Sequence, residues 1–229
     1  MNNVKLAVCD TETTGLVRPK PPASGVVQVA AVILNSATLE IESEQMEYVD
    51  PGCPIEPGAA KVHGITEDMV AGKPNLETAF GWDEPTLFIA HNAKFDLPRL
   101  SPCLPNVVGV LCTYEAARRY VKGSENHKLV TLTNHFGLPL LDAHDALGDV
   151  KMTRNLLVKL LEITGLTIWE MQKDLQKVKM PLEMPFGKHK GKKFTEIPIG
   201  YIDYMLGLPD VDSNVRKALE MQKKARGLV

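Results

Sequence analysis

The sequence places four carboxylates where predicted strands end and predicted helices begin. Asp10 and Glu12 follow a strand predicted at Val4–Val8, and side chains two positions apart on a strand point to the same face. Asp96 is predicted to close a strand-to-helix junction, and Asp149 to lie in the first turns of a helix. α/β domains carry their reactive groups at such positions. Taken alone, however, the segment around Asp10 is better explained as a polar turn that closes a strand.

Carboxylates that lie side by side repel one another unless a cation lies between them. Oxygen ligands without a cluster of Cys or His favour Mg²⁺ or Mn²⁺ over Zn²⁺. Four carboxylates carry too much negative charge for one cation, so we expect two ions that share Asp10. Such a pair, roughly 3.5–4 Å apart, stabilises both the attacking and the leaving oxygen of a phosphoryl transfer. The sequence therefore predicts a two-ion centre for this chemistry.

One histidine, His144, stands five residues before Asp149 and is expected in the loop that precedes the helix. From that loop it could approach the carboxylates, where a neutral imidazole can take a proton from the attacking water. Any single histidine is ordinarily a surface or core residue. Of the six histidines in the chain, we therefore predict only His144 as a general base.

The hydrophobic pattern predicts the elements that must position these groups. Strands are predicted at Val4–Val8, Val26–Asn35, Leu39–Val49, Thr86–Ala90 and Val107–Cys112. Short turns join the first three strands, which predicts an antiparallel meander with Leu39–Val49 at its edge. From about residue 86 strands alternate with helices, which predicts parallel strands added beside the meander. The predicted fold class is therefore α/β, with a mixed five-stranded sheet flanked by helices.

An acidic body and a basic tail divide the chain by charge. The 229 residues are 44% hydrophobic, enough for a sizeable core, and carry a formal net charge of −2. Residues 173–229 hold 12 Lys and Arg against 7 Asp and Glu, a net of +5, and residues 1–172 hold 14 against 21, a net of −7. This asymmetry predicts a metal-loaded enzyme whose tail contacts a polyanion, although a soluble basic helix would give the same composition.

Prolines 181 and 185 mark a linker within the tail. We predict a main domain at residues 1–165, a helix and linker at 166–185, and a small basic unit at 186–229. Glycines 187 and 191 permit a tight turn, which displays Lys188, Lys190, Lys192 and Lys193. These lysines would hold DNA phosphates without reading sequence, and binding should weaken as salt rises. A solvated basic hairpin without a ligand is the alternative.

The four cysteines are scattered, without the spacing of a zinc site or a C-x-x-C pair. Structural disulfides are therefore not expected, and a cytoplasmic protein is predicted. The N-terminal apolar run is short and broken by Asp10, so no signal peptide is expected. The longest apolar stretch, Val26 to Leu34, is too short to span a bilayer, so no membrane partner is expected.

Three segments together resemble the exonuclease motifs of the DEDDh (DnaQ-like) 3′→5′ exonucleases. The segments are Asp10–Gly15, His91–Asp96 and His144–Asp149, and their order and separation also match. The resemblance covers about residues 4–165 and implies an RNase H-like fold, two Mg²⁺ ions, for which Mn²⁺ can substitute, and release of nucleoside 5′-monophosphates from a 3′ end. It further implies that Asp10, Glu12, Asp96 and Asp149 are metal ligands and that His144 is the general base.

The same resemblance implies residues that contact the terminal nucleotide. These are Thr13, Thr14, Leu16, His63, Ile65 and Asn92. The basic segment from Met184 to Lys193 is similar to the C-terminus of one bacterial member of this family. His91 is as readily explained as a structural residue, and the segment around His63 as a turn before a helix.

Together these patterns predict a metal-dependent 3′→5′ exodeoxyribonuclease of DNA repair or turnover, acting on single-stranded or duplex 3′ ends. Alternatives are an enzyme that trims RNA, because the motifs do not distinguish a 2′-hydroxyl from a 2′-hydrogen, and a proofreading subunit of a polymerase. A nucleic-acid-binding module with an idle site belongs to a different class. The complete set of motif residues argues against that module, because a binder has no need of four clustered carboxylates.

Overall fold

The computed structural model describes residues 4–15, 25–141, 145–176, 183–208 and 211–227. The chain divides into two compact units, Met1–Leu175 and Gln176–Val229, each with a hydrophobic core of its own. The first unit extends beyond the predicted boundary at residue 165. It does so because the following helix buries Ile168 and Met171 in the core of that unit.

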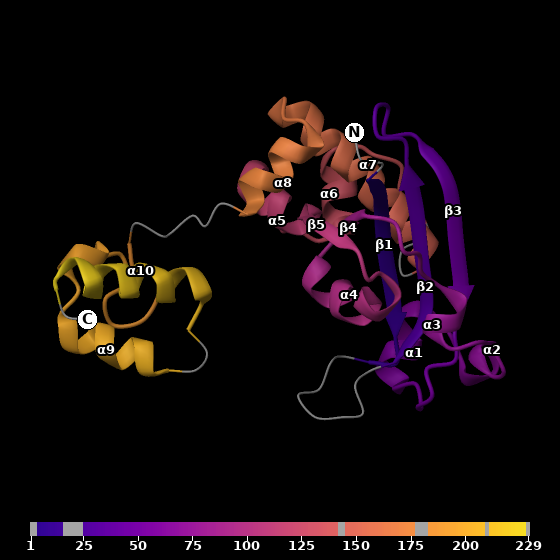
Figure 1. Cartoon of the computed structure of the whole chain (residues 1–229), viewed down its shortest axis with the longest axis horizontal. Coiled ribbons are helices and arrows are strands. Elements are labelled where there is room, and N and C mark those ends of the chain that lie inside the picture. Colours follow the sequence, from indigo (N-terminus) through magenta and orange to yellow (C-terminus); the bar gives the residue numbers. More distant parts are fainter. Residues whose placement is uncertain (1–3, 16–24, 142–144, 177–182, 209–210, 228–229) are drawn as a thin grey trace. The chain divides into compact units, whose positions relative to one another are not determined.

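A five-stranded sheet in the order β3-β2-β1-β4-β5 forms the centre of the first unit (Figure 1). Its strands are β1 (Lys5–Thr13), β2 (Val26–Leu34), β3 (Ile41–Tyr48), β4 (Thr86–Ala90) and β5 (Val107–Cys112). The first three form an antiparallel meander, whereas β4 and β5 are added beside β1 as parallel strands. The mixed sheet that the hydrophobic pattern predicts is therefore confirmed.

Helices cover both faces of this sheet. They are α1 (Pro57–His63), α2 (Glu67–Val70), α3 (Leu76–Ala79), α4 (Ala93–Leu100), the 3₁₀ turn η1 (Ser101–Cys103), α5 (Thr113–Tyr120), α6 (Leu129–His135), α7 (Ala146–Thr164) and α8 (Ile168–Gln176). Helices α5 to α8 share one core with Leu6 and Val8 of β1, whereas α3, α4 and η1 share a second core with Ala7 and Cys9. Alternate residues of a strand face opposite sides, so β1 contributes to both cores.

The central strand β1 is longer than the predicted strand at Val4–Val8. Its first half pairs with both neighbours, because Lys5 to Val8 lie opposite β4 on one side and β2 on the other. Beyond Val8 the strand continues to Thr13 through pairs with β2 alone. The polar second half of β1 therefore runs past the end of β4, and this leaves space beside it that α4 and α7 can reach.

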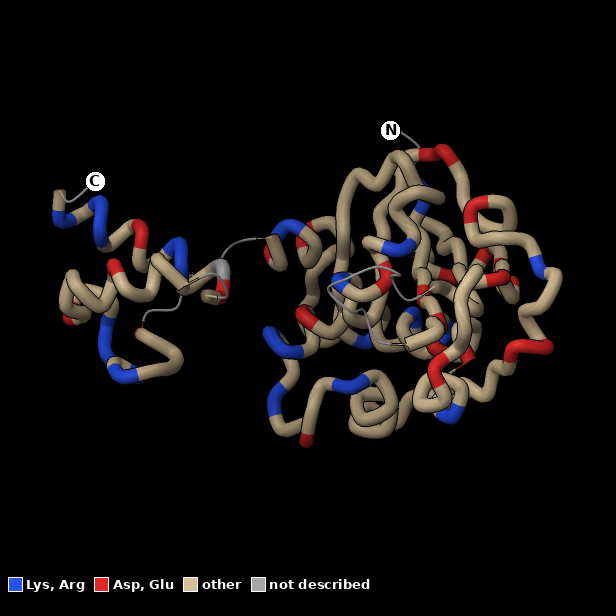
Figure 2. The backbone as a smooth tube through the Cα atoms, turned by 90° about the horizontal axis from the view of Figure 1, so that it is seen from below, with Lys and Arg blue, Asp and Glu red and all other residues tan. Residues whose placement is uncertain are grey.

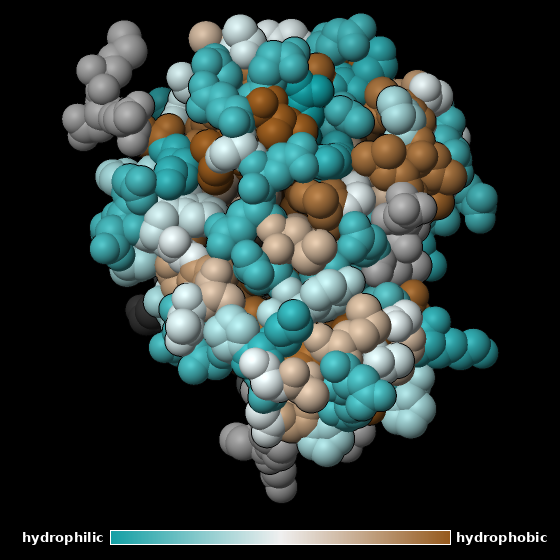
Figure 3. All heavy atoms as spheres, turned by 90° about the vertical axis from the view of Figure 1, so that its right-hand side faces the viewer, coloured by the Kyte–Doolittle hydropathy of each residue, from teal (hydrophilic) through white to brown (hydrophobic). Residues whose placement is uncertain are grey.

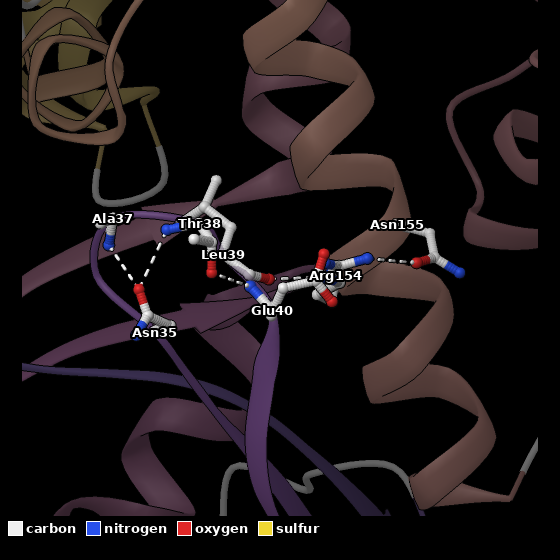
Figure 4. A network of polar contacts seen from close by, with 7 residues as sticks. All are labelled: Asn35, Ala37, Thr38, Leu39, Glu40, Arg154 and Asn155. Atoms are coloured by element: carbon white, nitrogen blue, oxygen red, sulfur yellow. Dashed lines mark hydrogen bonds and ion pairs between the residues drawn. The ribbon is translucent and has the colours of Figure 1, made fainter.

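Helix α7 is fixed to the turn between β2 and β3 (Figure 4). The side-chain oxygen of Asn35 accepts hydrogen bonds from two backbone N–H groups of this turn, at 2.9 and 3.0 Å. Arg154 of α7 donates from Nε to the carbonyl oxygen of Leu39 at 2.8 Å, and its guanidinium lies 3.5 Å from the Glu40 carboxylate. This contact anchors the middle of the helix that carries Asp149 in its first turn.

Strand β3 lies at the edge of the sheet, as predicted. Its glutamates 42, 44 and 47 are exposed, and charge on an edge strand discourages pairing with another chain. Lys151 of α7 forms an ion pair with Glu44 at 2.8 Å. Figure 3, in which the β3 side of Figure 1 faces the viewer, shows a mostly hydrophilic surface with separate hydrophobic patches.

The second unit consists of the 3₁₀ turn η2 (Phe194–Glu196) and the helices α9 (Ile199–Gly207) and α10 (Ser213–Ala225). Its buried core side chains are Met184, Phe194, Ile197, Ile202, Met205, Val215, Ala218 and Leu219. Arg226, just after α10, donates to three carbonyl oxygens in and after η2. Residues 176–229 hold 11 Lys and Arg against 6 Asp and Glu, a net of +5. Figure 2 shows the described Lys and Arg residues of this unit in blue along the tube.

Two further predictions concern the environment of the chain. Within the described ranges, no helix combines the length and the apolar character that a membrane crossing requires. The cysteines are free: Cys9 and Cys103 are buried, and Cys53 and Cys112 are half-buried.

Candidate active site

Three carboxylates from two elements meet beside the second half of β1. Asp10 and Glu12 are two residues apart on this strand and therefore point to the same side of the sheet. On that side α7 begins at Ala146 and presents Asp149 in its first turn. One oxygen from each of the three carboxylates lies within 4.8 Å of those of the other two. The structure thus brings together three of the four carboxylates that were predicted as a group.

Asp96 lies on α4 and is tied to β1 between the first two carboxylates. Its side chain is only 2% exposed and accepts hydrogen bonds from the N–H of Thr11 at 3.1 Å and from Thr11 Oγ1 at 2.7 Å. The predicted strand-to-helix junction at Asp96 is corrected, because α4 already begins at Ala93. Asn92 makes this early start possible, since its left-handed backbone, with φ of 77°, turns the chain from β4 into the helix.

Burial and mutual repulsion raise the pKa values of these carboxyl groups. The pKa of Asp10 lies well above its ordinary value, first because of burial and then because of the neighbouring carboxylates. Burial and the charges of Asp149 and Asp96 raise the pKa of Glu12 to about 8. Burial also raises the pKa of Asp96 to about 6, although the hydrogen bonds from Thr11 oppose this rise. The carboxylates therefore carry more negative charge than their surroundings stabilise.

This donor set fits a centre for hard divalent cations. The clustered groups are carboxylate oxygens, which Mg²⁺ and Mn²⁺ prefer, and none of the three is a thiol or an imidazole. Their separation of at most 4.8 Å allows them to share an ion. A cation placed among them would stabilise their ionised forms and remove the repulsion that raises their pKa values. The electrostatics and the ligand chemistry thus point to the same kind of occupant.

Gln28 of β2 fixes the first turn of α7. Its side chain is 1% exposed and lies opposite Glu12 in the register of β1 and β2. Its Nε2 donates to Asp145 Oδ1 at 2.8 Å, and its Oε1 accepts from the N–H of Ala146 at 3.0 Å. Asp145 in turn caps α7, because its other carboxylate oxygen accepts from a backbone N–H of the first turn at 3.1 Å. Gln28 therefore holds the turn that carries Asp149.

Three residues that support the site, Gln28, Asp145 and Thr11, were not predicted from the sequence. The signal for Gln28 is a single polar residue within the apolar run Val26–Leu34, because a buried amide needs hydrogen-bond partners. Asp145 carries the ordinary signal of a helix N-cap. Thr11 carries no such signal, since its partner is 85 residues away in sequence.

Thr13 and Thr14, which were predicted to contact the terminal nucleotide, are buried at 7% and 3% exposure. The Thr13 hydroxyl donates to the carbonyl oxygen of Gly15 at 2.9 Å. The Thr14 hydroxyl accepts from the N–H of Gly25 at 3.0 Å. The Thr14 side chain therefore links the end of β1 to the residue before β2, whereas the Thr13 side chain stabilises the turn that follows β1.

His63, which was predicted with Ile65 to contact the terminal nucleotide, contacts the end of β1. His63 lies at the end of α1, a helix that was not among the predicted elements, and its Nε2 lies 3.1 Å from the carbonyl oxygen of Thr13. Its Nδ1 accepts from the N–H of Ile65 at 3.0 Å, so Nε2 carries the proton and donates. Ile65 is 2% exposed and packs with Val27 and Val70.

His91 and its neighbour Asn92 have different surroundings. Asn92 is exposed at the start of α4. His91 Nε2 donates to the carbonyl oxygen of His127 at 3.0 Å, and its Nδ1 lies 2.9 Å from Thr113 Oγ1. Burial lowers the pKa of His91 to about 4, so its ring is neutral and acts as a structural link.

Two predicted site residues, His144 and Leu16, lie outside the described residues. His144 directly precedes Asp145, the N-cap residue that Gln28 holds. The roles of His144 as a general base and of Leu16 at the terminal base therefore stay predictions.

The four predicted phosphate-binding lysines lie on one turn of the second unit. Its two ends are joined by hydrogen bonds of 2.8 Å, from the N–H of Met184 to the Lys192 carbonyl and from the N–H of Gly191 to the Met184 carbonyl. Glycines 187 and 191 have φ values of 75° and 80°, which favour glycine. We call this segment the lysine turn; its exposed cations, none in an ion pair with any described residue, are Lys188, Lys190, Lys192 and Lys193.

Comparison with known proteins assigns this geometry to a family. The family model described as Exonuclease matches residues 7–157, which include Asp10, Glu12, Asp96 and Asp149. Exodeoxyribonuclease 10 of Escherichia coli strain K12 is 31% identical over 197 residues, which cover 84% of each chain. A DNA polymerase III PolC-type protein of Listeria welshimeri is 29% identical over 71% of this chain, but the match covers only 12% of that protein.

Solved structures show the same fold. A structure of exonuclease X in complex with 5′ overhanging duplex DNA is 32% identical, with a TM-score of 0.61, and the match covers 74% of this chain and 99% of that chain. The nuclease domain of 3′hExo, a DEDDh family member bound to rAMP, is 18% identical, with a TM-score of 0.56 over 71% of this chain and 94% of that one. The predicted RNase H-like (DnaQ-like) fold is confirmed.

Proposed function

Because the chain belongs to the DEDDh (DnaQ-like) 3′→5′ exonucleases, we propose that it hydrolyses DNA from the 3′ end and releases nucleoside 5′-monophosphates. The observation that carries this proposal is the cluster of Asp10, Glu12 and Asp149, with Asp96 fixed to β1 by two hydrogen bonds. We propose DNA as the substrate because a relative aligned over 84% of both chains is named an exodeoxyribonuclease, and a structure 32% identical contains DNA.

The four carboxylates are proposed to hold two divalent cations, with Mg²⁺ as the natural ion and Mn²⁺ as a substitute. When bound, the two ions supply Lewis acidity at the scissile phosphate and offset charge on the attacking and leaving oxygens. The chain's own contribution is to fix the ligands. Thr11 orients Asp96, and Gln28 orients the first turn of α7 that presents Asp149. Asp10 is proposed as the ligand that the two ions share.

His144 is proposed as the general base that accepts a proton from the attacking water. The imidazole group of a histidine ordinarily has a pKa near neutral pH, which suits a general base. The residue that follows it, Asp145, is the N-cap of α7 and is anchored by Gln28. The same anchor would then place the base and Asp149 together.

The substrate is proposed to meet the chain in two places. Around the terminal nucleotide the proposed contacts are Thr13, Thr14, Leu16, His63, Ile65 and Asn92. Residues 186–229 are proposed as a small DNA-binding unit, in which the lysine turn contacts phosphates without reading sequence. We place the enzyme in the reducing cytoplasm, with which its free cysteines are consistent, and in DNA repair or turnover.

The test is hydrolysis by the purified chain of 5′-labelled DNA with a single-stranded, overhanging or blunt 3′ end, beside an RNA of matched sequence. Each substrate is incubated with Mg²⁺, with Mn²⁺ or with EDTA. We expect a ladder of DNA products, together with free nucleoside 5′-monophosphates, only when a metal is added. Faster shortening of the RNA than of the DNA would indicate that the chain is an RNA-trimming enzyme instead. No product from any strand would indicate a nucleic-acid-binding module with an idle site.

Proofreading for a polymerase is a second candidate function. It is favoured by the 29% identity to the PolC-type protein over 71% of this chain. A proofreading enzyme should remove a mispaired 3′ nucleotide faster than a paired one and should raise the fidelity of a polymerase supplied in the same reaction. Equal rates on paired and mispaired ends, with unchanged fidelity, would leave the chain as a free-standing exonuclease.

A further inference from the structure

The lysine turn is in direct contact with an aromatic side chain of α9. A Cβ atom added at Gly187 would lie 2.5 Å from the hydroxyl oxygen of Tyr201. Glycine is therefore required here for two reasons, its left-handed backbone and the close approach of the tyrosine. The Tyr201 hydroxyl therefore lies directly against the backbone of the lysine turn.

Three aromatic rings continue from this contact in a row. The ring of His189, between Lys188 and Lys190 in sequence, lies 4.5 Å from the ring of Tyr201, centroid to centroid. Tyr201 in turn lies 5.9 Å from Tyr204, which is 60% exposed. The row thus runs from the middle of the lysine turn onto the surface of α9 and ends on a ring that is open to solvent.

The surroundings of the first ring favour its neutral form. Burial, together with the charges of Lys192 and Lys188, lowers the pKa of His189. Its Nδ1 is buried and has no hydrogen-bond partner among the described residues. The two half-buried rings, His189 and Tyr201, thus support one exposed ring, Tyr204, which is open for stacking beside four cations.

This combination matches the requirements of a single strand. Cations that follow a backbone, with aromatic rings on which bases stack, are the two parts from which single-strand sites are built. A duplex can use the cations but not the rings, because its base faces are already stacked. Two carboxylate residues contact the backbone of the lysine turn at its end: Glu183 forms a bridge with Lys193, and the Glu196 carboxylate accepts from the N–H of Lys193 at 3.2 Å. The Asp203 carboxylate, beside Tyr204 in sequence, is paired with Lys223 at 2.7 Å.

We propose that the lysine turn and the row His189–Tyr201–Tyr204 form a binding site for single-stranded DNA, with phosphates on the lysines and an unpaired base on Tyr204. The proposal rests on the proposed function in so far as the strand is a DNA substrate. The proposal goes beyond that function because it assigns unpaired bases, rather than phosphates alone, as the feature that this unit recognises. The second unit then favours strands that the exonuclease can shorten without first opening a duplex.

The experiment measures binding of the full chain to a 5′-fluorescent oligothymidylate of about 20 nucleotides and to a blunt duplex. EDTA is present throughout, so no strand is hydrolysed and the result does not depend on catalysis. We expect Tyr204→Ala to weaken single-strand binding by about 5- to 100-fold, the range for one stacked base, and to change duplex binding by less than about twofold. Tyr204→Phe should bind like the wild type, whereas Tyr204→Leu should bind like Tyr204→Ala.

Two further variants and one further strand complete the design. Replacing all four lysines of the turn with Gln should weaken binding to both strands and flatten the single-strand salt slope by about 3 units, since each phosphate contributes about 0.7. Met221→Ala, which removes another exposed apolar side chain of this unit, should change neither the binding affinity nor the salt slope. On an abasic strand, Tyr204→Ala should lose its effect.

Several outcomes would overturn the proposal. They are an absence of single-strand binding by the wild type, an unchanged affinity in Tyr204→Ala, an equal loss on the duplex or the abasic strand, and full binding by Tyr204→Leu. Failure of the proposed function would look different, because it is an absence of metal-dependent hydrolysis by the wild type, whatever the strand affinity. Thermal unfolding of each variant confirms that the second unit is folded.

Discussion

The chain carries two clusters of like charge, and they are built in opposite ways. Asp10, Glu12 and Asp149 come from two elements far apart in sequence, are half-buried and lie within 4.8 Å of one another. The lysine turn collects four cations from one short stretch and leaves them exposed. Repulsion within the first cluster raises carboxyl pKa values, whereas water and salt screen the second.

The carboxylate cluster therefore needs a bound cation to offset its repulsion, whereas the lysine turn tolerates the absence of a bound anion. Holding half-buried carboxylates together opposes folding, and the hydrogen bonds of Gln28 and the packing of α7 must offset the repulsion. The lysine turn stays in water, so its repulsion opposes folding little. Substitutions in the carboxylate cluster should therefore change activity and stability in opposite directions, whereas substitutions in the lysine turn should change binding alone.

The largest expected effect is the loss of one carboxylate. Asp149→Ala should lower the rate of hydrolysis by about 10⁴-fold or more. Such a variant loses stabilisation of the reacting oxygens, worth about 10²–10³-fold, and activation of the water, worth about 10²–10⁴-fold. The rate of nucleotide release at saturating Mn²⁺ is the measurement, and Asp68→Ala, an exposed aspartate of α2, is the control. A rate within about tenfold of the wild type would exclude the cluster from catalysis.

The next effect concerns His144. His144→Ala should slow hydrolysis by about 10²–10⁴-fold, the usual range for a lost general base, while Mn²⁺ affinity stays that of the wild type. Slower hydrolysis with an unchanged Mn²⁺ affinity distinguishes a general base from a metal ligand. His135→Ala, which replaces an exposed histidine of α6, serves as the control. Near-normal turnover of the His144 variant would refute its role.

The elements that place the two clusters could be predicted from sequence to different extents. Apolar alternation predicts the strands. At the end of α7, Gly165 takes a left-handed φ of 65°, a conformation that favours glycine at a helix end. The continuation of β1 through Asp10 to Thr13 could not be predicted from local sequence, because these residues are typical of a turn. Only their pairing with β2 makes them a strand.

The convergence of the carboxylates on one site could not be predicted from hydrophobic periodicity alone. Three motifs recognised together indicate which carboxylates belong to one site, but they do not indicate what holds them. The hydrogen bond from Gln28 to Asp145 spans 117 residues, and that from Thr11 to Asp96 spans 85, so no local pattern predicts either. The lysine turn is the opposite case, because neighbouring residues form it and glycines 187 and 191 predict its shape.

Gln28 offers a way to loosen the carboxylate cluster without removing a carboxylate. Gln28→Leu removes the hydrogen bonds to Asp145 and Ala146, so the turn that carries Asp149 loses its anchor. We expect Mn²⁺ affinity to fall by about 10- to 100-fold, the range for groups that orient metal ligands. Titration calorimetry measures the affinity, and Gln45→Leu, which removes a hydrogen bond to the Ala79 carbonyl elsewhere, is the control. A lower melting temperature with unchanged Mn²⁺ affinity would assign Gln28 a purely structural role.

The smallest expected effect is on stability, and it tests the comparison of the two clusters directly. The pKa of Glu12 is about 8 in the folded chain and 4.5 in its ordinary state, so between these values the folded state holds a proton that unfolding releases. The metal-free chain should therefore lose stability as the pH rises from about 4.5 to 8. Glu12→Gln removes this loss and should stabilise the metal-free chain at pH above 8 by about 1–2 kcal/mol, or about 2–8 °C in melting temperature.

Thermal unfolding in EDTA at both ends of this pH range gives the measurement. Below the ordinary pKa of 4.5 Glu12 becomes protonated in both states, so the difference between wild type and variant should disappear as the pH falls below the lower end. Glu47→Gln, an exposed glutamate of β3, and the four-lysine variant should melt like the wild type at either pH. Added Mn²⁺ should reverse the order at high pH, because it stabilises only a chain that retains the ligand. Equal melting of Glu12→Gln and wild type in EDTA at high pH would show that the fold tolerates the carboxylate cluster as easily as it tolerates the lysines.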